Sequence, residues 1–180
     1  FNSSIQTVTT LDVSNSSIVR LAGIQGFTAL TNLNCSTNQL QQLDITSNTS
    51  LKELNVSSNQ LENLDLSKNI ALTNIIADSN ELKSLDISKN TDLTDFSCKN
   101  NEIESIDFTL NTELTILDCS NNALTELNVA KNTKLVKLTS KNNQLSALNV
   151  NNNTAMKHLD FSSNQVTSID LTKNKALTQL

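Results

Sequence analysis

The chain has 180 residues, of which 37% are hydrophobic and only 3% aromatic, a small supply for one compact core. Its formal net charge of -5 argues against a nucleic-acid partner, because binding to phosphates needs clustered Lys and Arg. No run of about eighteen apolar residues is present, so the sequence predicts no membrane span.

The first 29 residues precede the regular part of the chain. Residues 1–7 are polar except for Phe1 and Ile5, and we interpret them as the remnant of an upstream cap or coil. Residues 8–29 are an atypical 22-residue first repeat. The only two glycines, Gly23 and Gly26, lie here and predict a sharp return without a strand.

Seven 21-residue repeats occupy residues 30–176 without a gap. Each reads L-x-x-L-x-(C/V/A/S/F)-x-x-N-x-L-x-x-L-(D/N)-Φ-x-x-N-x-x, where Φ is apolar. The alternation L-x-Φ occurs twice per repeat and is typical of short, half-buried strands. The sequence therefore predicts a mainly β solenoid of about eight coils, with two short parallel β-sheets and little or no α-helix.

Residues 177–180 begin a truncated further repeat. A solenoid needs polar terminal caps to cover its last apolar layers, and neither end of this sequence shows one. We expect the natural protein to continue on both sides.

Two columns of Asn recur at the predicted bends. Because an amide both donates and accepts, a buried Asn can satisfy backbone groups in its own coil and in the next coil. The first coil has Ser16 in place of the first column, so we expect its bend to be held differently. Asn101 is expected to be structural, whereas Asn100 beside it is expected to contribute little. The predicted Asn ladder comprises Asn38, Asn59, Asn80, Asn101, Asn122, Asn143 and Asn164 in one column and Asn48, Asn69, Asn90, Asn111, Asn132, Asn153 and Asn174 in the other.

The motif L-x-x-L-x-C-x-x-N-x-L resembles that of bacterial leucine-rich-repeat proteins, in particular the subclass whose 21-residue repeat has a second L-x-x-L-D-L-x-x-N half. The first coil, L-D-V-S-N-S-S-I-V-R-L-A-G-I-Q-G-F, resembles the internalin-like coil of secreted surface proteins of Gram-negative bacteria. The resemblance covers residues 8–180 and implies a right-handed leucine-rich-repeat solenoid. It also implies a secreted or cell-surface, extracellular bacterial protein that binds a protein or adheres to a cell-surface component.

The sequence predicts no catalytic residues, no cofactor and no metal site. Cys35, Cys98 and Cys119 share the sixth repeat position and are expected to be buried free thiols, because in-register stacking directs their Cβ atoms in parallel. His158, Asp160 and Ser162 contain the letters of a hydrolase triad. Alternate strand residues are about 6.6 Å apart, so His and Ser would be too far apart to react together.

The second half-repeat carries a column of Asp that becomes Asn in two coils: Asp44, Asp65, Asp86, Asp107, Asn128, Asn149 and Asp170. Carboxylates at strand spacing repel by roughly 1 kcal/mol, so we expect nearby hydroxyl, backbone N–H or Lys groups to compensate. Calcium between the carboxylates is the alternative.

The outward residues of the first half-repeat change chemistry from coil to coil, whereas those of the second half-repeat are monotonous. The varied face is therefore the better candidate for recognition, with two isoleucines inside a charged rim. We expect a monomeric, non-enzymatic interaction or adhesion module; the alternatives are a structural spacer and a calcium-stabilised adhesive array. The candidate partner-binding residues are Ile76, Asp78, Asp95, Lys99, Ile116, Asp118, Lys137, Lys141 and His158.

Overall fold

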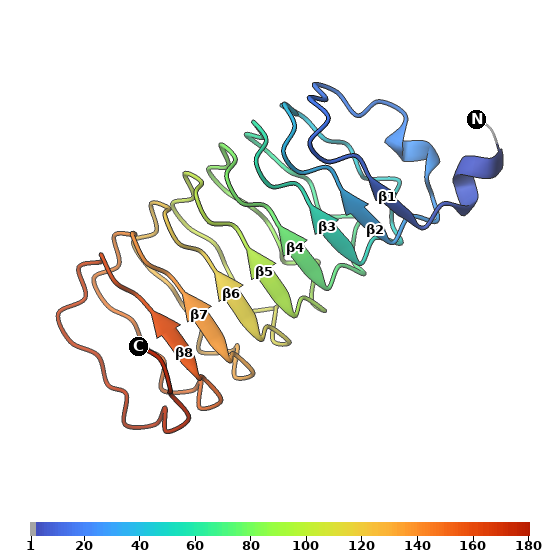
Figure 1. Cartoon of the computed structure of the whole chain (residues 1–180). Coiled ribbons are helices and arrows are strands. Elements are labelled where there is room, and N and C mark those ends of the chain that lie inside the picture. The colour runs from blue at the N-terminus through green and yellow to red at the C-terminus, as the bar shows by residue number, and fades with distance from the viewer. Residues whose placement is uncertain (1–2) are drawn as a thin grey trace.

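The structure is a computed structural model that describes residues 3–180. Phe1, in the segment 1–7 interpreted as an upstream remnant, lies outside the described residues; most of the segment forms the 3-10 helix η1 (Ser3–Thr7). Eight parallel strands follow in chain order and form one sheet, in which every strand pairs with its sequence neighbours (Figure 1). The strands are β1 (Thr10–Asp12), β2 (Asn32–Asn34), β3 (Glu53–Asn55), β4 (Asn74–Ile76), β5 (Asp95–Ser97), β6 (Ile116–Asp118), β7 (Lys137–Thr139) and β8 (His158–Asp160).

The register of this sheet follows the repeat. Leu33 pairs with Leu54, and the same column continues to Ile75 and Phe96, so successive coils stack without a slip. The middle residue of each strand from β2 onward is buried, and its two neighbours are more exposed except in β7, where Thr139 is buried as well. The predicted mainly β leucine-rich-repeat solenoid is confirmed.

The first coil differs from the others in its return segment, which turns sharply at a glycine, as the sequence predicted. Gly23 has φ 87°, a left-handed conformation that disfavours a side chain, and it precedes the 3-10 helix η2 (Ile24–Gly26). As predicted, this return contains no strand.

The L-x-Φ alternation in the second half-repeats predicted a second parallel sheet, and this prediction is wrong in extent. Among the described residues, the second half-coils contribute only one isolated bridge, between Asn128 and Asn149. Each Asp of the column binds the backbone N–H two residues later, as Asp65 does with Ser67 at 2.9 Å. Asn55 makes the same bond at the end of a paired strand, so this bond alone does not prevent a ladder. The single bridge lies where two adjacent column members are uncharged, so no carboxylate repulsion separates them.

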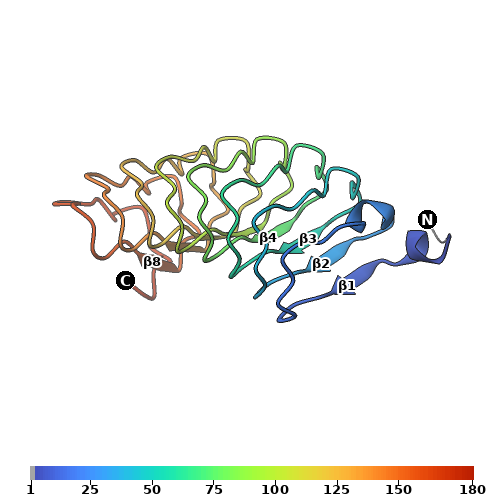
Figure 2. The same cartoon turned by 90° about the horizontal axis from the view of Figure 1, so that it is seen from above.

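The array is therefore held most closely on its strand side. Figure 2 shows it as an arch, with the strands along the inner side and the second half-coils along the outer side. Leu, Ile and Val side chains fill the interior between the two sides. In one coil Phe96 and Phe108 meet edge to face, with ring centroids 5.9 Å apart.

The first Asn column connects three backbone segments at each bend. The Nδ2 of Asn101 donates to the carbonyl of Ala77 in the preceding coil at 3.0 Å and to that of Cys98 in its own coil at 2.9 Å. Its Oδ1 accepts the N–H of Leu82 at 3.1 Å. In the first coil, which has Ser16 in place of Asn, the Oδ1 of Asn38 accepts the N–H groups of both Ser16 and Ile18.

The second Asn column only donates. The Nδ2 of Asn111 reaches the carbonyls of Ile87 and Asn90 at 3.1 and 2.9 Å. Its Oδ1 is buried without a hydrogen-bond donor, and the same holds along the column: Asn48, Asn69, Asn90, Asn132, Asn153 and Asn174.

Asn100 has a role that the sequence did not indicate. Its φ is 56°, in the left-handed region, and its Nδ2 donates to the Oγ of Ser79 at 3.2 Å. Asn121 donates to Asn100 at 2.7 Å, and Asn142 donates to Asn121 at 2.6 Å, so the three form an exposed amide ladder. The expectation that Asn100 contributes little is corrected: an Ala in this conformation costs about 1 to 2 kcal/mol.

Asn101→Ala is predicted to lower the free energy of unfolding by about 1 to 3 kcal/mol, because it leaves partly buried backbone groups of three segments unpaired. Urea melts followed by circular dichroism give the measurement. The control is Asn63→Ala, because the Asn63 side chain is exposed and makes no hydrogen bond with the described residues. Equal losses in the two variants would contradict the role of the column.

Candidate functional site

Much of the polar chemistry on the strand face serves the fold. At the end of β3 the Oδ1 of Asn55 accepts the N–H and the hydroxyl of Ser57 at 3.0 and 2.7 Å. Asp118 makes the same pair of bonds with Ser120 at 3.0 and 2.6 Å. Asp118, one of the predicted partner-binding residues, is therefore engaged within its own coil.

The coil of Ile76 breaks this pattern. Ile76 takes the place of the Asn or Asp acceptor, and the carboxylate of Asp78 instead reaches the next coil. It accepts the Ser97 hydroxyl at 2.5 Å and the Lys99 N–H at 3.1 Å, and Lys99 Nζ lies 3.4 Å from its other oxygen. Asp78 and Lys99 thus pair with each other, and the buried Asp78 is not free to meet a partner.

The break leaves an apolar hollow of about 190 Å³ on the face. Ile76 on β4 and Ile116 on β6 lie on either side of β5, whose Ser97 is too short to fill the space between them. Ile116 is 41% exposed, which makes it one of the few large apolar side chains outside the core. The residues that line the hollow are Asn74, Ile75, Ile76, Asp95, Phe96, Ser97 and Ile116.

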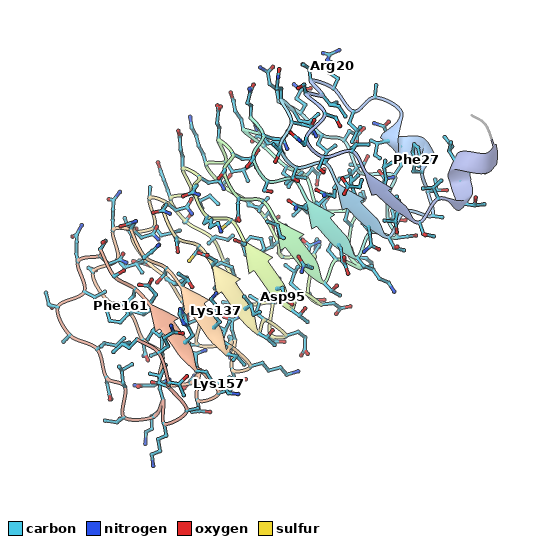
Figure 3. All side chains as sticks on the ribbon, viewed as in Figure 1. Arg20, Phe27, Asp95, Lys137, Lys157 and Phe161 are labelled. Atoms are coloured by element: carbon cyan, nitrogen blue, oxygen red, sulfur yellow. The ribbon has the colours of Figure 1, made fainter. Side chains whose placement is uncertain are left out.

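The structure places the remaining predicted residues around this hollow or beyond it. Lys137 follows Ile116 in the same outward column, and His158 follows Lys137. Lys137 is exposed and makes no hydrogen bond or ion pair with the described residues, whereas His158 Nδ1 contacts Gln179 Oε1 at 2.7 Å. Lys141 lies near Asp160, whose pKa is lowered mainly by the Ser162 hydroxyl. Asp95 and Lys137 can be followed in Figure 3.

Sequence reasoning missed two residues that border the hollow, Asn74 and Ser97. Asn74 belongs to the outward column of Asp95 and Ile116, and Ser97 belongs to that of Ile76. The sequence did contain one signal for the hollow, which is that the small Ser97 lies in the coil between those of Ile76 and Ile116. This signal becomes visible only when the strand register is known.

The Asp column lies on the opposite side and is exposed. The N–H of the residue two positions later is the main cause that lowers the pKa of Asp86, Asp107 and Asp170. For Asp44 and Asp65 the hydroxyl of that residue is the main cause. The expected compensation by hydroxyl and backbone N–H groups is therefore present. No group of three or more acidic, His or Cys side chains in residues 3–180 is arranged to hold a metal ion.

Larger hollows also lie on this side, between the separated second half-coils. One of about 560 Å³ is bordered by Asp44 and Asp65, and another of about 480 Å³ by Asp86 and Asp107. Both borders include members of the Asp column, and the remaining residues are mostly Gln and Glu at the first hollow and Ser, Ile and Leu at the second.

The three cysteines are buried and free. Burial raises the pKa of Cys35 and Cys119 to about 12 and that of Cys98 well above its ordinary value. Because the thiolate is the reactive form, these are inert core residues. Free, buried thiols are what the shared column predicts.

The letters of a hydrolase triad do not form one. The Ser162 hydroxyl donates to Asp160 at 2.7 Å, and His158 contacts Gln179 instead of Ser162. Among the described residues, no helix has the length and apolar character required to cross a bilayer.

These coils define a leucine-rich-repeat protein, and a family model described as "Leucine Rich repeat" matches residues 47–68 and 152–173. The functional domain of InlJ from Listeria monocytogenes, which includes a cysteine ladder, is 40% identical with a TM-score of 0.97; the match covers 98% of this chain. The chain spans only 39% of that InlJ chain.

Two less similar solved structures show the same fold. Internalin C2 from Listeria monocytogenes is 21% identical with a TM-score of 0.87, over 99% of this chain and 83% of its own. A leucine-rich-repeat protein of Leptospira interrogans is 20% identical with a TM-score of 0.81, over 97% of this chain and 54% of its own. No curated protein gives a significant sequence match. The matches support a bacterial leucine-rich-repeat protein with internalin-like neighbours.

The thiols are predicted to be unreactive toward DTNB at pH 8 in the folded protein and to react fully in guanidinium chloride, because burial disfavours the thiolate. A Ser84→Cys variant supplies an exposed thiol as the control and should show one equivalent of rapid reaction. Rapid reaction of the unmodified chain would contradict the burial of Cys35, Cys98 and Cys119.

Acid is predicted to destabilise the fold through the Asp column. The folded pKa values of Asp44, Asp65, Asp86 and Asp107 lie below 3.8, so these carboxylates stabilise the fold above that pH. This contribution is lost as the pH falls through the folded pKa values. The melting temperature should therefore drop steeply below about pH 4.

Replacing these four Asp with Asn tests the origin of the drop. Asn128 and Asn149 already make the same bond to the N–H two residues later, at 3.1 and 3.0 Å, so the variant keeps the bond and loses the titration. A matched variant replaces four exposed glutamates that make no side-chain hydrogen bond with the described residues: Glu62, Glu81, Glu102 and Glu126, each to Gln. The Asp variant should show the smaller acid-induced drop in melting temperature; equal drops would refute the assignment.

Proposed function

We propose that this chain is a non-enzymatic protein-interaction or adhesion module of a secreted or cell-surface bacterial protein. It has no cofactor and acts as a monomer, and its partner is another protein or a cell-surface component. The 21-residue repeat subclass and an origin in a Gram-negative bacterium are part of the proposal. The 40% identity to the InlJ domain supports it. That domain includes a cysteine ladder, and this chain likewise has two cysteines, Cys98 and Cys119, at the same position of adjacent coils.

The observation that carries the proposal is the hollow between Ile76 and Ile116. Its volume of about 190 Å³ is below the range of about 300 to 1,000 Å³ typical of small-molecule sites, so it fits a single side chain of a partner. An apolar centre with polar and charged neighbours is the usual anatomy of a protein interface. Lys137 and Asp95 supply the charged neighbours.

The inner side of the arch suits this role better than the outer side. Its side chains differ from strand to strand, whereas the outer hollows repeat one Asp or Asn column whose oxygens already accept backbone N–H groups. Specific binding requires chemistry that changes along the surface, because a uniform row offers no unique register to a partner.

Ile76→Asp/Ile116→Asp is predicted to weaken binding of a partner captured by the unmodified chain at least about tenfold, because central apolar contacts carry most interface energy. The matched control is Ser67→Asp/Ser88→Asp, which adds the same charge to the outer side, where Ser67 is exposed and Ser88 is half-buried. Pull-down against surface proteins, followed by titration of the captured partner, gives the measurement. If the control loses the partner and the strand-face variant keeps it, the proposed face is wrong; if no partner binds the unmodified chain, the spacer alternative is favoured.

A further inference from the structure

The carboxylate of Asp95 lies at the border of the hollow without a positive charge to balance it. Its Oδ2 accepts the Thr94 hydroxyl at 2.7 Å, and its Oδ1 makes no hydrogen bond with the described residues. The nearest column neighbours of Asp95 are Asn74 and Ile116, and Lys99 on its own coil pairs with Asp78. Asp95 is half-buried beside apolar surface, so it is a carboxylate with an unused acceptor oxygen.

A second acceptor lies next to it. Asn74 pairs in register with Asp95, and its side chain makes no hydrogen bond with the described residues. Neighbouring strands are about 4.8 Å apart, so the Asn74 amide and the Asp95 carboxylate lie in adjacent positions of one outward column at the border of the hollow. The other borders are apolar: Ile76 lies on the same strand as Asn74, and Ile116 follows Asp95 in its column, while Ile75 and Phe96 form the floor.

We infer that the hollow accepts an arginine side chain of the partner, with the aliphatic stem on Ile76 and Ile116 and the guanidinium on Asp95 and Asn74. Arginine combines an apolar stem with a planar cation that donates through several N–H groups, and it is suited to two neighbouring acceptors. Lysine presents a compact, more strongly hydrated charge, which fits two spaced acceptors less well. The net charge of -5 on this chain also favours a cationic group on the partner.

Lys137 determines the orientation in which a partner segment lies across the strands. It lies beside Ile116 on the side away from Asp95 and has no negative partner among the described residues. A partner segment therefore presents its arginine toward β4 and β5, and a neutral or acidic residue toward β7. This inference rests on the proposed binding role of the strand face and specifies its chemistry.

Titration of the isotopically labelled chain with three capped amino acids, followed by backbone amide chemical shifts in NMR spectra, tests the inference. The probes are N-acetyl-arginine methylamide, the citrulline analogue with nearly the same shape and no charge, and the norleucine analogue with the stem alone. The arginine probe should shift the amides of Asn74, Ile76, Asp95 and Ile116 and bind about fivefold more tightly than the other two.

Asp95→Asn should abolish this preference, because the substitution removes the charge and keeps the shape. Asp92→Asn is the matched control, since Asp92 is exposed in the same coil region and borders no part of the hollow. Raising the salt concentration should weaken the arginine probe alone, a readout that needs no variant.

Equal binding of the three probes, or no shift at the hollow with any of them, would overturn the inference. The pull-down of the Ile76→Asp/Ile116→Asp variant reports separately on the proposed function. Loss of the partner in that variant, without an arginine preference in the titration, would leave the strand face as the interface and remove arginine as its ligand.

Discussion

The array depends on side-chain amides that hydrogen-bond the carbonyl groups of two successive coils. Each Nδ2 of the first Asn column has one hydrogen for its own coil and one for the preceding coil, as Asn80 shows with Ala77 and Val56. Ser has one donor hydrogen, and an ionised Asp has none, so neither can replace this pattern. Where the first coil has Ser16, the Oδ1 of Asn38 takes two N–H groups from that coil. The repeat is thus fixed by hydrogen-bond valence as well as by apolar burial.

The two Asn columns differ, and this difference accounts for the shape. On the strand side, the Oδ1 of each first-column Asn also accepts an N–H from the preceding coil, as Asn59 does from Leu40 at 3.0 Å. At the second column the Oδ1 atoms remain without donors, and the adjacent Asp residues bind N–H groups of their own coil. One side of each coil is therefore tied to its neighbour at many points, whereas the other side is tied at few. An arch with its strands on the inner side follows (Figure 2).

The sequence predicted those features that the period determines. The coil count, the buried strand centres and the positions of the Asn columns all follow from identical residues that recur every 21 positions. It failed at the second half-coils: Leu43 and Ile45 alternate correctly for a strand, but Asp44 and Asp65 place like charges in adjacent coils, and the only bridge there among the described residues joins the uncharged Asn128 and Asn149. It also failed at Asn100, because nothing in a run of two Asn distinguishes the left-handed residue from the buried one.

Of the candidate site, the sequence indicated the outward position of two isoleucines but not the hollow between them or its borders. Ile76 and Ile116 were chosen as apolar residues at outward positions, and periodicity alone is enough for that. The bonding of Asp78 and Asp118 was not predictable in the same way, because an outward Asp at a strand end can either face solvent or close a local turn. Only the register of Ser97 between the two isoleucines creates the hollow.

The strand-face pattern is broken in three coils, at Ile76, Ser97 and Thr139, and the breaks differ in a way that bears on function. At Thr139 the acceptor is missing and nothing replaces it, since the hydroxyls of Thr139 and Ser140 are buried without partners. At Ser97 the missing acceptor is replaced, because Asp78 of the preceding coil accepts the Ser97 hydroxyl and the Lys99 N–H. At Ile76 no side-chain acceptor takes the place of Asn or Asp, and the position carries an isoleucine on the strand face, where burial gives no stabilisation to the isolated chain. An exposed apolar group gains that stabilisation only when a partner covers it, and this is the physical reason to locate recognition at β4 to β6.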